Sequence, residues 1–392
     1  MSQQLISLSP DLARLRDEGY EVSIEFGHLV MRHIPYVSAD RTVKFGILVS
    51  SLALSGDRTV VPNTHVVMFA GSYPCDQNGS PLLKISHFSQ RQVIGDGLAI
   101  DHGFSSKPAG GYPDYHAKMS TYAAIISSPA EAIDPSVTAR TRRVIETNDD
   151  SPFVYMDNAS GRAGITALTR KLREQSVAIV GLGGTGSYLL DLLAKTPVKQ
   201  IHLYDGDEFE QHNAFRSPGA ASIECLRERP RKVDYLQDIY TKMHRHIVVH
   251  PEYITPENVG QLAQHSMVFL CIDANEIKRS IVAGMEASGV PFIDVGMGLQ
   301  LVDDKLVGTL RTTTSTPAMR GHVHSRSRIP MEQIDADDIY AGNIQVAELN
   351  SLNACLAVIR WKKLRGFYAD TEGEHFSLYT VDANHLLNED LA

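Results

Sequence analysis

A glycine-rich segment that follows an apolar run constrains this chain more than any other feature. The sequence VAIVGLGGTGSYLLDLL contains the spacing G-x-G-x-x-G at Gly181, Gly183 and Gly186, with Gly184 inside it. Glycines allow a tight turn after a buried strand, and they let phosphate oxygens approach the backbone at the start of the next helix. The segment therefore predicts a nucleotide-binding strand–turn–helix unit.

Around this segment, short apolar runs alternate with helical segments. Five such runs occupy residues 177–182, 200–204, 247–250, 267–272 and 291–295. This alternation indicates a parallel sheet with crossover helices. A later strand is expected at residues 306–313 and a long helix at residues 344–367. We therefore predict a Rossmann-like α/β domain, with a mainly parallel sheet, over residues 161–392.

The first part of the chain has a different pattern. Short β-like runs are separated by turn residues, which predicts a β-rich α+β domain over residues 1–145 and a linker at residues 146–160. No motif connects this domain with a particular chemistry. Tyr115, Lys118 and Tyr122 form either a recognition surface or part of the interior.

The composition limits the classes of function. A net charge of -9 argues against a nucleic-acid partner, which needs a basic surface. No apolar stretch is long enough to span a membrane and no secretory signal is visible, so we expect a cytoplasmic protein without a membrane partner. Without a CxxC pair, the cysteines indicate neither a zinc knuckle nor a disulfide framework. They are Cys75, Cys225, Cys271 and Cys355.

Polar residues after the glycine segment distinguish two nucleotide chemistries. Asp205 ends the following strand, at a distance along the chain that suits a carboxylate bound to ribose hydroxyls. To this point, an NAD-dependent oxidoreductase would look the same. Arg216 and Lys232, however, provide cations for a triphosphate attacked at its α-phosphorus, and Asp273 provides a carboxylate for magnesium.

Taken together, these motifs resemble a known family. GLGGTG, DGD, N-x-x-R, the helical lysine and the aspartate after the fourth strand match the adenylation domain shared by ubiquitin-activating enzymes and the bacterial adenylyltransferases for sulfur-carrier proteins. The resemblance covers about residues 162–367. It implies that ATP and Mg²⁺ bind here, with the ribose at Asp205, the metal at Asp273 and the nucleotide also beside Asp207.

The resemblance also assigns the remaining site residues. It implies that Asn213, Arg216 and Lys232 contact the phosphates. The family donates an arginine across a homodimer to the triphosphate, which here corresponds to Arg162, with Arg170 as the second candidate. We therefore expect a homodimer.

The implied reaction is activation of a ubiquitin-like protein that ends in glycine. Its C-terminal carboxylate attacks the α-phosphorus of ATP, pyrophosphate leaves, and the acyl group passes to a conjugating enzyme. The first domain is then expected to select the ubiquitin-like substrate or that enzyme. Three alternatives stay open: a sulfur-carrier adenylyltransferase, an NAD-dependent oxidoreductase and a catalytically inactive scaffold.

The chain departs from ubiquitin-activating enzymes in one respect. The segment after residues 306–313 contains no cysteine to receive the acyl group. The acyl group therefore goes directly to a partner, to a hydroxyl of Thr314, Ser315 or Thr316, or to a cysteine elsewhere, of which Cys75 is expected in an exposed turn. His322 or His324 is expected at the mouth of the site. Their HxH spacing before Asp335 also fits a zinc site, which the adenylation pattern disfavours.

Overall fold

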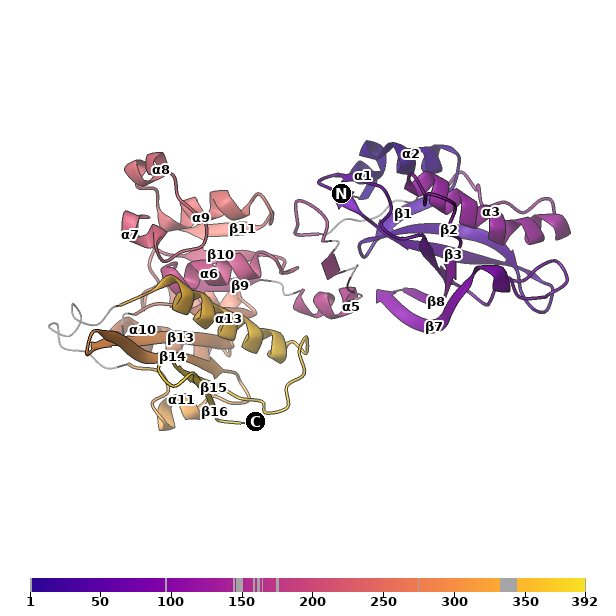
Figure 1. The fold of residues 1–392 in the computed structure, drawn as a ribbon. Coiled ribbons are helices and arrows are strands. Elements are labelled where there is room, and N and C mark those ends of the chain that lie inside the picture. The colour runs from indigo at the N-terminus through magenta and orange to yellow at the C-terminus, as the bar shows by residue number, and fades with distance from the viewer. Residues whose placement is uncertain are drawn as a thin grey trace. The chain divides into compact units, whose positions relative to one another are not determined.

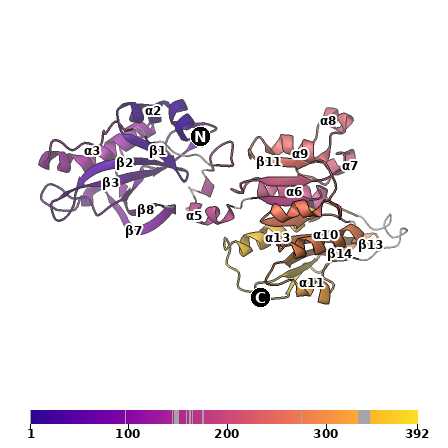
Figure 2. The same cartoon turned by 180° about the vertical axis from the view of Figure 1, so that it is seen from behind.

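The computed structural model describes residues 2–95, 97–143, 145, 151–157, 159–160, 163, 165–173, 176–273, 275–331 and 344–391. The chain divides into two compact units, which are described one at a time (Figures 1 and 2). The first unit comprises Met1–Asp150 and Tyr155–Arg170. The second comprises Ser151–Val154 and Lys171–Ala392.

The first unit is built on an antiparallel sheet with the strand order β1-β2-β3-β6-β8-β7. These strands are β1 (Glu21–Glu25), β2 (His28–Val37), β3 (Val43–Ser51), β6 (Val66–Ala70), β7 (Ser86–Gly95) and β8 (Leu98–Ser105). A small ribbon is formed by β4 (Leu54–Ser55) and β5 (Arg58–Thr59). The helical elements are α1 (Ser2–Leu8), α2 (Pro10–Asp17), η1 (Leu83–Ile85), α3 (Tyr115–Ile133) and α5 (Thr166–Thr169). The predicted β-rich α+β fold is confirmed.

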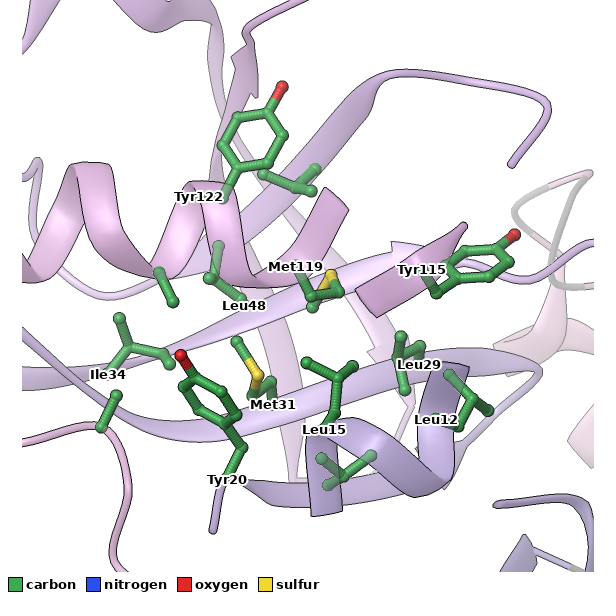
Figure 3. Close-up of a cluster of buried hydrophobic side chains, with 14 of the residues drawn as sticks. Leu12, Leu15, Tyr20, Leu29, Met31, Ile34, Leu48, Tyr115, Met119 and Tyr122 are labelled. Atoms are coloured by element: carbon green, nitrogen blue, oxygen red, sulfur yellow. The ribbon is translucent and has the colours of Figure 1, made fainter. Parts of the chain in front are cut away.

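Helices α2 and α3 cover the sheet of the first unit and close its core. Figure 3 shows Leu12 of α2, Met31 of β2 and Met119 of α3 among the side chains that meet there. Burying each such side chain stabilises the fold by roughly 1.5–3 kcal/mol. Tyr115 and Tyr122 are also fully buried in α3, so they form part of the interior and not a recognition surface.

The second unit contains an eight-stranded sheet with the order β11-β10-β9-β12-β13-β14-β15-β16. The strands are β9 (Val177–Val180), β10 (Ile201–Tyr204), β11 (Ile247–His250), β12 (Met267–Leu270), β13 (Phe292–Val302), β14 (Lys305–Ser315), β15 (Phe376–Thr380) and β16 (His385–Glu389). Neighbours from β11 to β13 are parallel, and those from β13 to β16 are antiparallel. The predicted Rossmann-like sheet is confirmed, with an antiparallel extension at one edge.

Helices cover both faces of the parallel part. The helical elements of the second unit are η2 (Arg170–Leu172), α6 (Gly184–Leu193), α7 (Gln211–Ala214), α8 (Ile223–Glu228), α9 (Lys232–Tyr240), η3 (Val259–Gln264), α10 (Asn275–Ala287), α11 (Gly321–Ser325) and α13 (Ala347–Leu364). Val177 and Ile179 of β9 face the core formed with α6, α9 and α13, whereas Ala178 and Val180 face the core formed with α10. Burial on both faces explains why β9 is an unbroken apolar run.

The position of β9 creates the place for a ligand. It lies between β10 and β12. The strands that follow it in sequence, β10 and β11, lie on one side of it, and the next strand, β12, lies on the other side. Such a switch point opens a crevice beyond the carboxyl ends of the parallel strands. Among the described residues, no helix is both long and apolar enough to cross a bilayer.

Candidate active site

A cavity of about 330 Å³ opens beyond the carboxyl ends of the parallel strands. Strands β9, β10 and β13 contribute residues to its wall, as do the segments that follow β11 and β12 and the helix α13. Of the predicted residues, the cavity brings together Gly181, Gly183, Gly184, Asp205, Asp207, Arg216, Lys232 and Asp273. Sequence positions from 181 to 273 therefore meet at one site.

The glycines of the loop have different reasons to be glycine. Gly181 has a φ of +90°, and a Cβ there would lie 2.6 Å from the carbonyl oxygen of Cys271. At Gly186, a Cβ would lie 1.9 Å from the carbonyl oxygen of Gly181, so this glycine lets α6 approach the loop. Gly183 borders the cavity, yet a Cβ there would meet no protein atom within 4 Å. The protein alone gives no steric reason for a glycine at position 183, which fits close approach of a ligand.

Asp205 holds the loop in its conformation. Its Oδ2 accepts a hydrogen bond of 2.6 Å from the backbone N–H of Leu182, and its Oδ1 accepts one of 2.9 Å from Asp207. Burial raises the pKa of this carboxyl, although Lys232 and the two N–H groups act in the opposite direction. The side chain expected to bind ribose thus also orders the glycine loop.

Lys232, at the start of α9, forms ion pairs with the carboxylates of Asp205 and Asp207. Its Nζ lies 2.5 Å from Oδ2 of Asp207 and 3.8 Å from Oδ1 of Asp205. Burial raises the pKa of Asp207, but hydrogen bonds from Lys232 and from the Tyr253 hydroxyl outweigh it, and the pKa is lowered overall. Lys232 is itself buried, so its charge is held in a place of low dielectric beside the cavity.

Arg216 and Asp273 face the cavity on its β12 side. Nε of Arg216 is buried and has no hydrogen-bond partner in the described part of the chain. Burial lowers the pKa of this guanidinium, and the nearby Asp273 partly counteracts the effect. Asp273 follows β12, is exposed, and lies 3.4 Å from the side-chain nitrogen of Gln345. A half-buried guanidinium whose Nε is unpaired within the described part of the chain is suited to bind an anionic ligand.

Asn213 has a structural role beside the cavity. Its Oδ1 accepts a 2.9 Å hydrogen bond from the backbone N–H of Glu210, which completes the capping box of α7. The residue lines an adjoining hollow of about 480 Å³, which shares Asp207, Arg216 and Lys232 with the main cavity. Its predicted contact with phosphate stays a prediction.

The structure does not test which arginine is donated across a dimer. Arg162 lies outside the described residues. Arg170 belongs to the first unit, where its guanidinium lies 5.0 Å from the centre of the Phe26 ring. The predicted donation of an arginine by a second copy stays a prediction.

The expected acyl acceptors are corrected in several places. Strand β14 continues to Ser315, so Thr314 and Ser315 are buried in the sheet instead of lying in a loop. Thr316 is half-buried, and its hydroxyl accepts a hydrogen bond from the Met319 backbone. Cys75, expected in an exposed turn, is buried, and burial raises the pKa of its thiol.

Three more side chains can be placed relative to the cavity. Cys271 does line the cavity, but burial raises the pKa of its thiol, so it is a poor nucleophile. Neither His322 nor His324 lines the cavity. His322 is buried against the Thr314 carbonyl oxygen, and His324 lies 2.8 Å from Glu286.

Several residues of the cavity were not predicted from the sequence. Tyr253 follows β11, and its hydroxyl donates to Asp207. Asn350 and Asn353 of α13, Gln345 before it and Thr185 also line the wall. Two of these had a signal in the sequence: Tyr253 follows an apolar run, as Asp205 and Asp273 do, and Thr185 lies within the glycine segment.

The comparisons with known proteins agree with this geometry. Residues 158–316 match the ThiF family, and residues 10–158 match a domain of unknown function, DUF6791. The chain contains a ThiF-family domain. The predicted resemblance to the adenylation superfamily is thereby confirmed, as is the presence of a separate domain before it.

Relatives of the ThiF-family domain share it over a limited length. The tRNA threonylcarbamoyladenosine dehydratase of Escherichia coli (strain K12) is 28% identical over 129 residues, which are 31% of this chain and 45% of that protein. Ubiquitin-like modifier-activating enzyme 5 of Culex quinquefasciatus is 23% identical over 172 residues, which are 41% of this chain and 42% of that enzyme. The chain thus spans less than half the length of these curated relatives.

Solved structures are similar at a low level. The crystal structure of E. coli MccB with ATP has a TM-score of 0.45 and 14% identity, over 60% of this chain and 72% of that one. That of selenomethionine PaaA has a TM-score of 0.44 and 18% identity, over 57% and 74%. These scores are too low to assign the fold from either structure, so the fold assignment rests on the strand order described above.

Proposed function

We propose that this chain adenylates the C-terminal carboxylate of a ubiquitin-like protein with ATP and magnesium, for transfer to a conjugating enzyme. The observation that carries the proposal is the combination, in one cavity at a ThiF-family glycine loop, of Asp205, Lys232, Arg216 and Asp273. An oxidoreductase has no use for the two cations, and an inactive scaffold has no need to keep all four groups in one cavity.

The chemistry follows from these charges. A carboxylate oxygen of the substrate attacks the α-phosphorus, the bond to the bridging oxygen of pyrophosphate breaks, and pyrophosphate leaves with that electron pair. The carboxylate is already ionised, so no general base is needed. Asp205 would hold the ribose hydroxyls, while Arg216 and Lys232 would stabilise the charge that builds on the phosphates.

The donors at the cavity fit a magnesium ion. Among the described residues, no three side chains of histidine, cysteine, aspartate or glutamate cluster as metal ligands. Magnesium commonly uses one or two carboxylates together with phosphate oxygens and water. Asp273, an exposed carboxylate on the cavity wall, would provide the protein ligand. The ion would neutralise charge on the leaving pyrophosphate.

The proposed assembly extends beyond this chain. We propose a homodimer in which Arg162 of one copy reaches the triphosphate of the other, and a first unit that selects the ubiquitin-like substrate or the conjugating enzyme. Direct transfer from the acyl-adenylate to a partner is favoured, because Thr314, Ser315 and Cys75 are buried. The relative named as an activating enzyme for ubiquitin-like modifiers supports this substrate class.

Magnesium-dependent exchange between ATP and labelled pyrophosphate tests the proposal. Candidate ubiquitin-like proteins ending in glycine are added to the wild type and to Asp273→Asn. We expect exchange that requires the protein substrate and falls at least about a hundredfold in the variant, as for loss of a major electrostatic contact. Exchange with a sulfur carrier as the only active substrate would identify the chain as a sulfur-carrier adenylyltransferase. NAD binding without exchange would identify it as an oxidoreductase.

A further inference from the structure

Two asparagine amides on α13 line the cavity without satisfying their hydrogen-bonding groups. Asn350 and Asn353 are each only 1% exposed. Nδ2 of Asn350 and Oδ1 of Asn353 have no hydrogen-bond partner among the residues that the structure describes. Leaving a buried polar atom unpaired costs about 1–3 kcal/mol, so such atoms commonly serve a ligand.

The contacts of the two amides fix what they present. Nδ2 of Asn353 donates a 3.1 Å hydrogen bond to the carbonyl oxygen of Gly296, which only accepts, so its Oδ1 is the group left over. Oδ1 of Asn350 accepts a 2.9 Å hydrogen bond from the Thr185 hydroxyl, which leaves its Nδ2. The pair therefore offers one acceptor and one donor, one helical turn apart.

The order of the strands places these amides away from the ribose end of the cavity. Tyr253 follows β11 and Asp205 follows β10, on one side of the glycine loop. Gly296 belongs to β13, on the other side, beyond β12. Asn353 is bonded to Gly296, so its amide borders the part of the cavity left for a second substrate once the ribose lies at Asp205. Asn350, bonded to Thr185, lies between this part and the glycine loop.

We propose that Asn350 and Asn353 bind the backbone of the acyl substrate, which makes them specificity-determining residues for a peptide-like tail. The N–H and C=O of one trans peptide bond point in opposite directions, so the leftover Oδ1 of Asn353 accepts from one N–H of the tail and the leftover Nδ2 of Asn350 donates to the C=O of a different peptide bond. The N–H assigned to Asn353 is that of the last peptide bond, next to the reacting carboxylate. This inference rests on the proposed adenylation and adds the chemistry by which the tail is recognised.

A substrate pair that differs in one atom tests this assignment. One synthetic hexapeptide ends in Gly-Gly, and the other ends in glycolate, where an ester oxygen replaces the last peptide N–H. Pyrophosphate exchange is measured with each peptide for the wild type, Asn353→Ala, Asn350→Leu and Ser351→Ala. Ser351 is the control, because it lies on the same helix and does not line the cavity.

We expect the wild type and Ser351→Ala to have a KM about tenfold lower for the amide than for the ester, the value of one hydrogen bond. Asn353→Ala should abolish this preference, and Asn350→Leu should raise the KM of both peptides. The KM for ATP should stay unchanged in Asn353→Ala, because Asn353 is bonded to strand β13, whereas Asn350 is bonded to the glycine loop. Rescue of discrimination by Asn353→Gln would add support if Asn353→Ala folds poorly.

Three results would overturn the assignment. The first is exchange with intact ubiquitin-like proteins while the wild type treats the two peptides alike. The second is a raised KM for ATP in Asn353→Ala with an unchanged preference for the amide peptide, which would assign this amide to the nucleotide. The third is no exchange with any peptide or protein, which would refute the proposed adenylation as well.

Discussion

Replacing Asp205 with asparagine tests whether this carboxylate orders the glycine loop or only binds ribose. In the structure its two oxygens accept hydrogen bonds from the N–H groups of Leu182 and Asp207. An asparagine has one oxygen, so one backbone N–H would face another donor and remain unpaired. Such a loss costs about 1–3 kcal/mol. The amide also avoids burying a charge, which offsets part of the loss, and we expect a net destabilisation of about 2 kcal/mol.

The single tryptophan provides the assay. Trp361 is fully buried in the core of the second unit, so its fluorescence reports unfolding of that unit. A loss of about 2 kcal/mol should lower the melting temperature of the nucleotide-free protein by roughly 4–8 °C. Asp304→Asn is the matched control, because Asp304 is exposed and its φ of 56° suits asparagine. An Asp205→Asn protein that melts like the wild type, but binds ATP poorly, would refute the structural role.

Three further results are expected. Gly183→Ala should keep the stability of the nucleotide-free protein within about 0.5 kcal/mol of the wild type and should weaken ATP binding. Gly186→Ala should lower the melting temperature, because its Cβ would lie 1.9 Å from a carbonyl oxygen. Similar melting temperatures of the two variants would contradict this. Burial lowers the pKa of His202 from its ordinary 6.5 to about 4, so between these values the unfolded chain binds more protons and stability falls as the pH falls. His202→Gln should flatten that dependence in urea titrations, and an unchanged slope would contradict the reasoning. Burial lowers the pKa of Lys118 to about 7, and its Nζ donates to the Ser50 hydroxyl and lies 5.9 Å from the centre of the Tyr115 ring. Because no carboxylate is among these contacts, Lys118→Met should stabilise the first unit by roughly 1–2 kcal/mol in urea unfolding followed by circular dichroism. A loss of stability would contradict this reasoning.

The sequence predicted those parts of the site that follow directly from strands. Asp205 and Asp273 come after apolar runs, and parallel strands bring their carboxyl ends to one edge, so their meeting at the cavity could be predicted. The glycine segment also directly follows an apolar run, so its spacing indicated the loop. Local patterns were sufficient because the chemistry and the fold share the same short segments.

The remainder depends on packing between distant segments. Asn350 reaches the glycine loop because α13 packs against α6, and no local pattern records that contact. Thr314 and Ser315 were predicted in a loop. This was wrong because strand β14 extends two residues beyond the predicted end at position 313. Cys75 looked exposed among turn residues, but bridges to Val37 and Pro81 bury it.

The position of nucleophilic attack is the most direct test of the central claim. A substrate whose C-terminal carboxylate is labelled with ¹⁸O at both oxygens is incubated with ATP, magnesium and hydroxylamine as the acyl acceptor, and the nucleotide product is analysed by mass spectrometry. If the carboxylate attacks the α-phosphorus, AMP should contain one ¹⁸O atom, because the carboxylate oxygen stays on phosphorus when the acyl group leaves. Unlabelled AMP, or ADP with labelled phosphate, would contradict adenylation of the carboxylate.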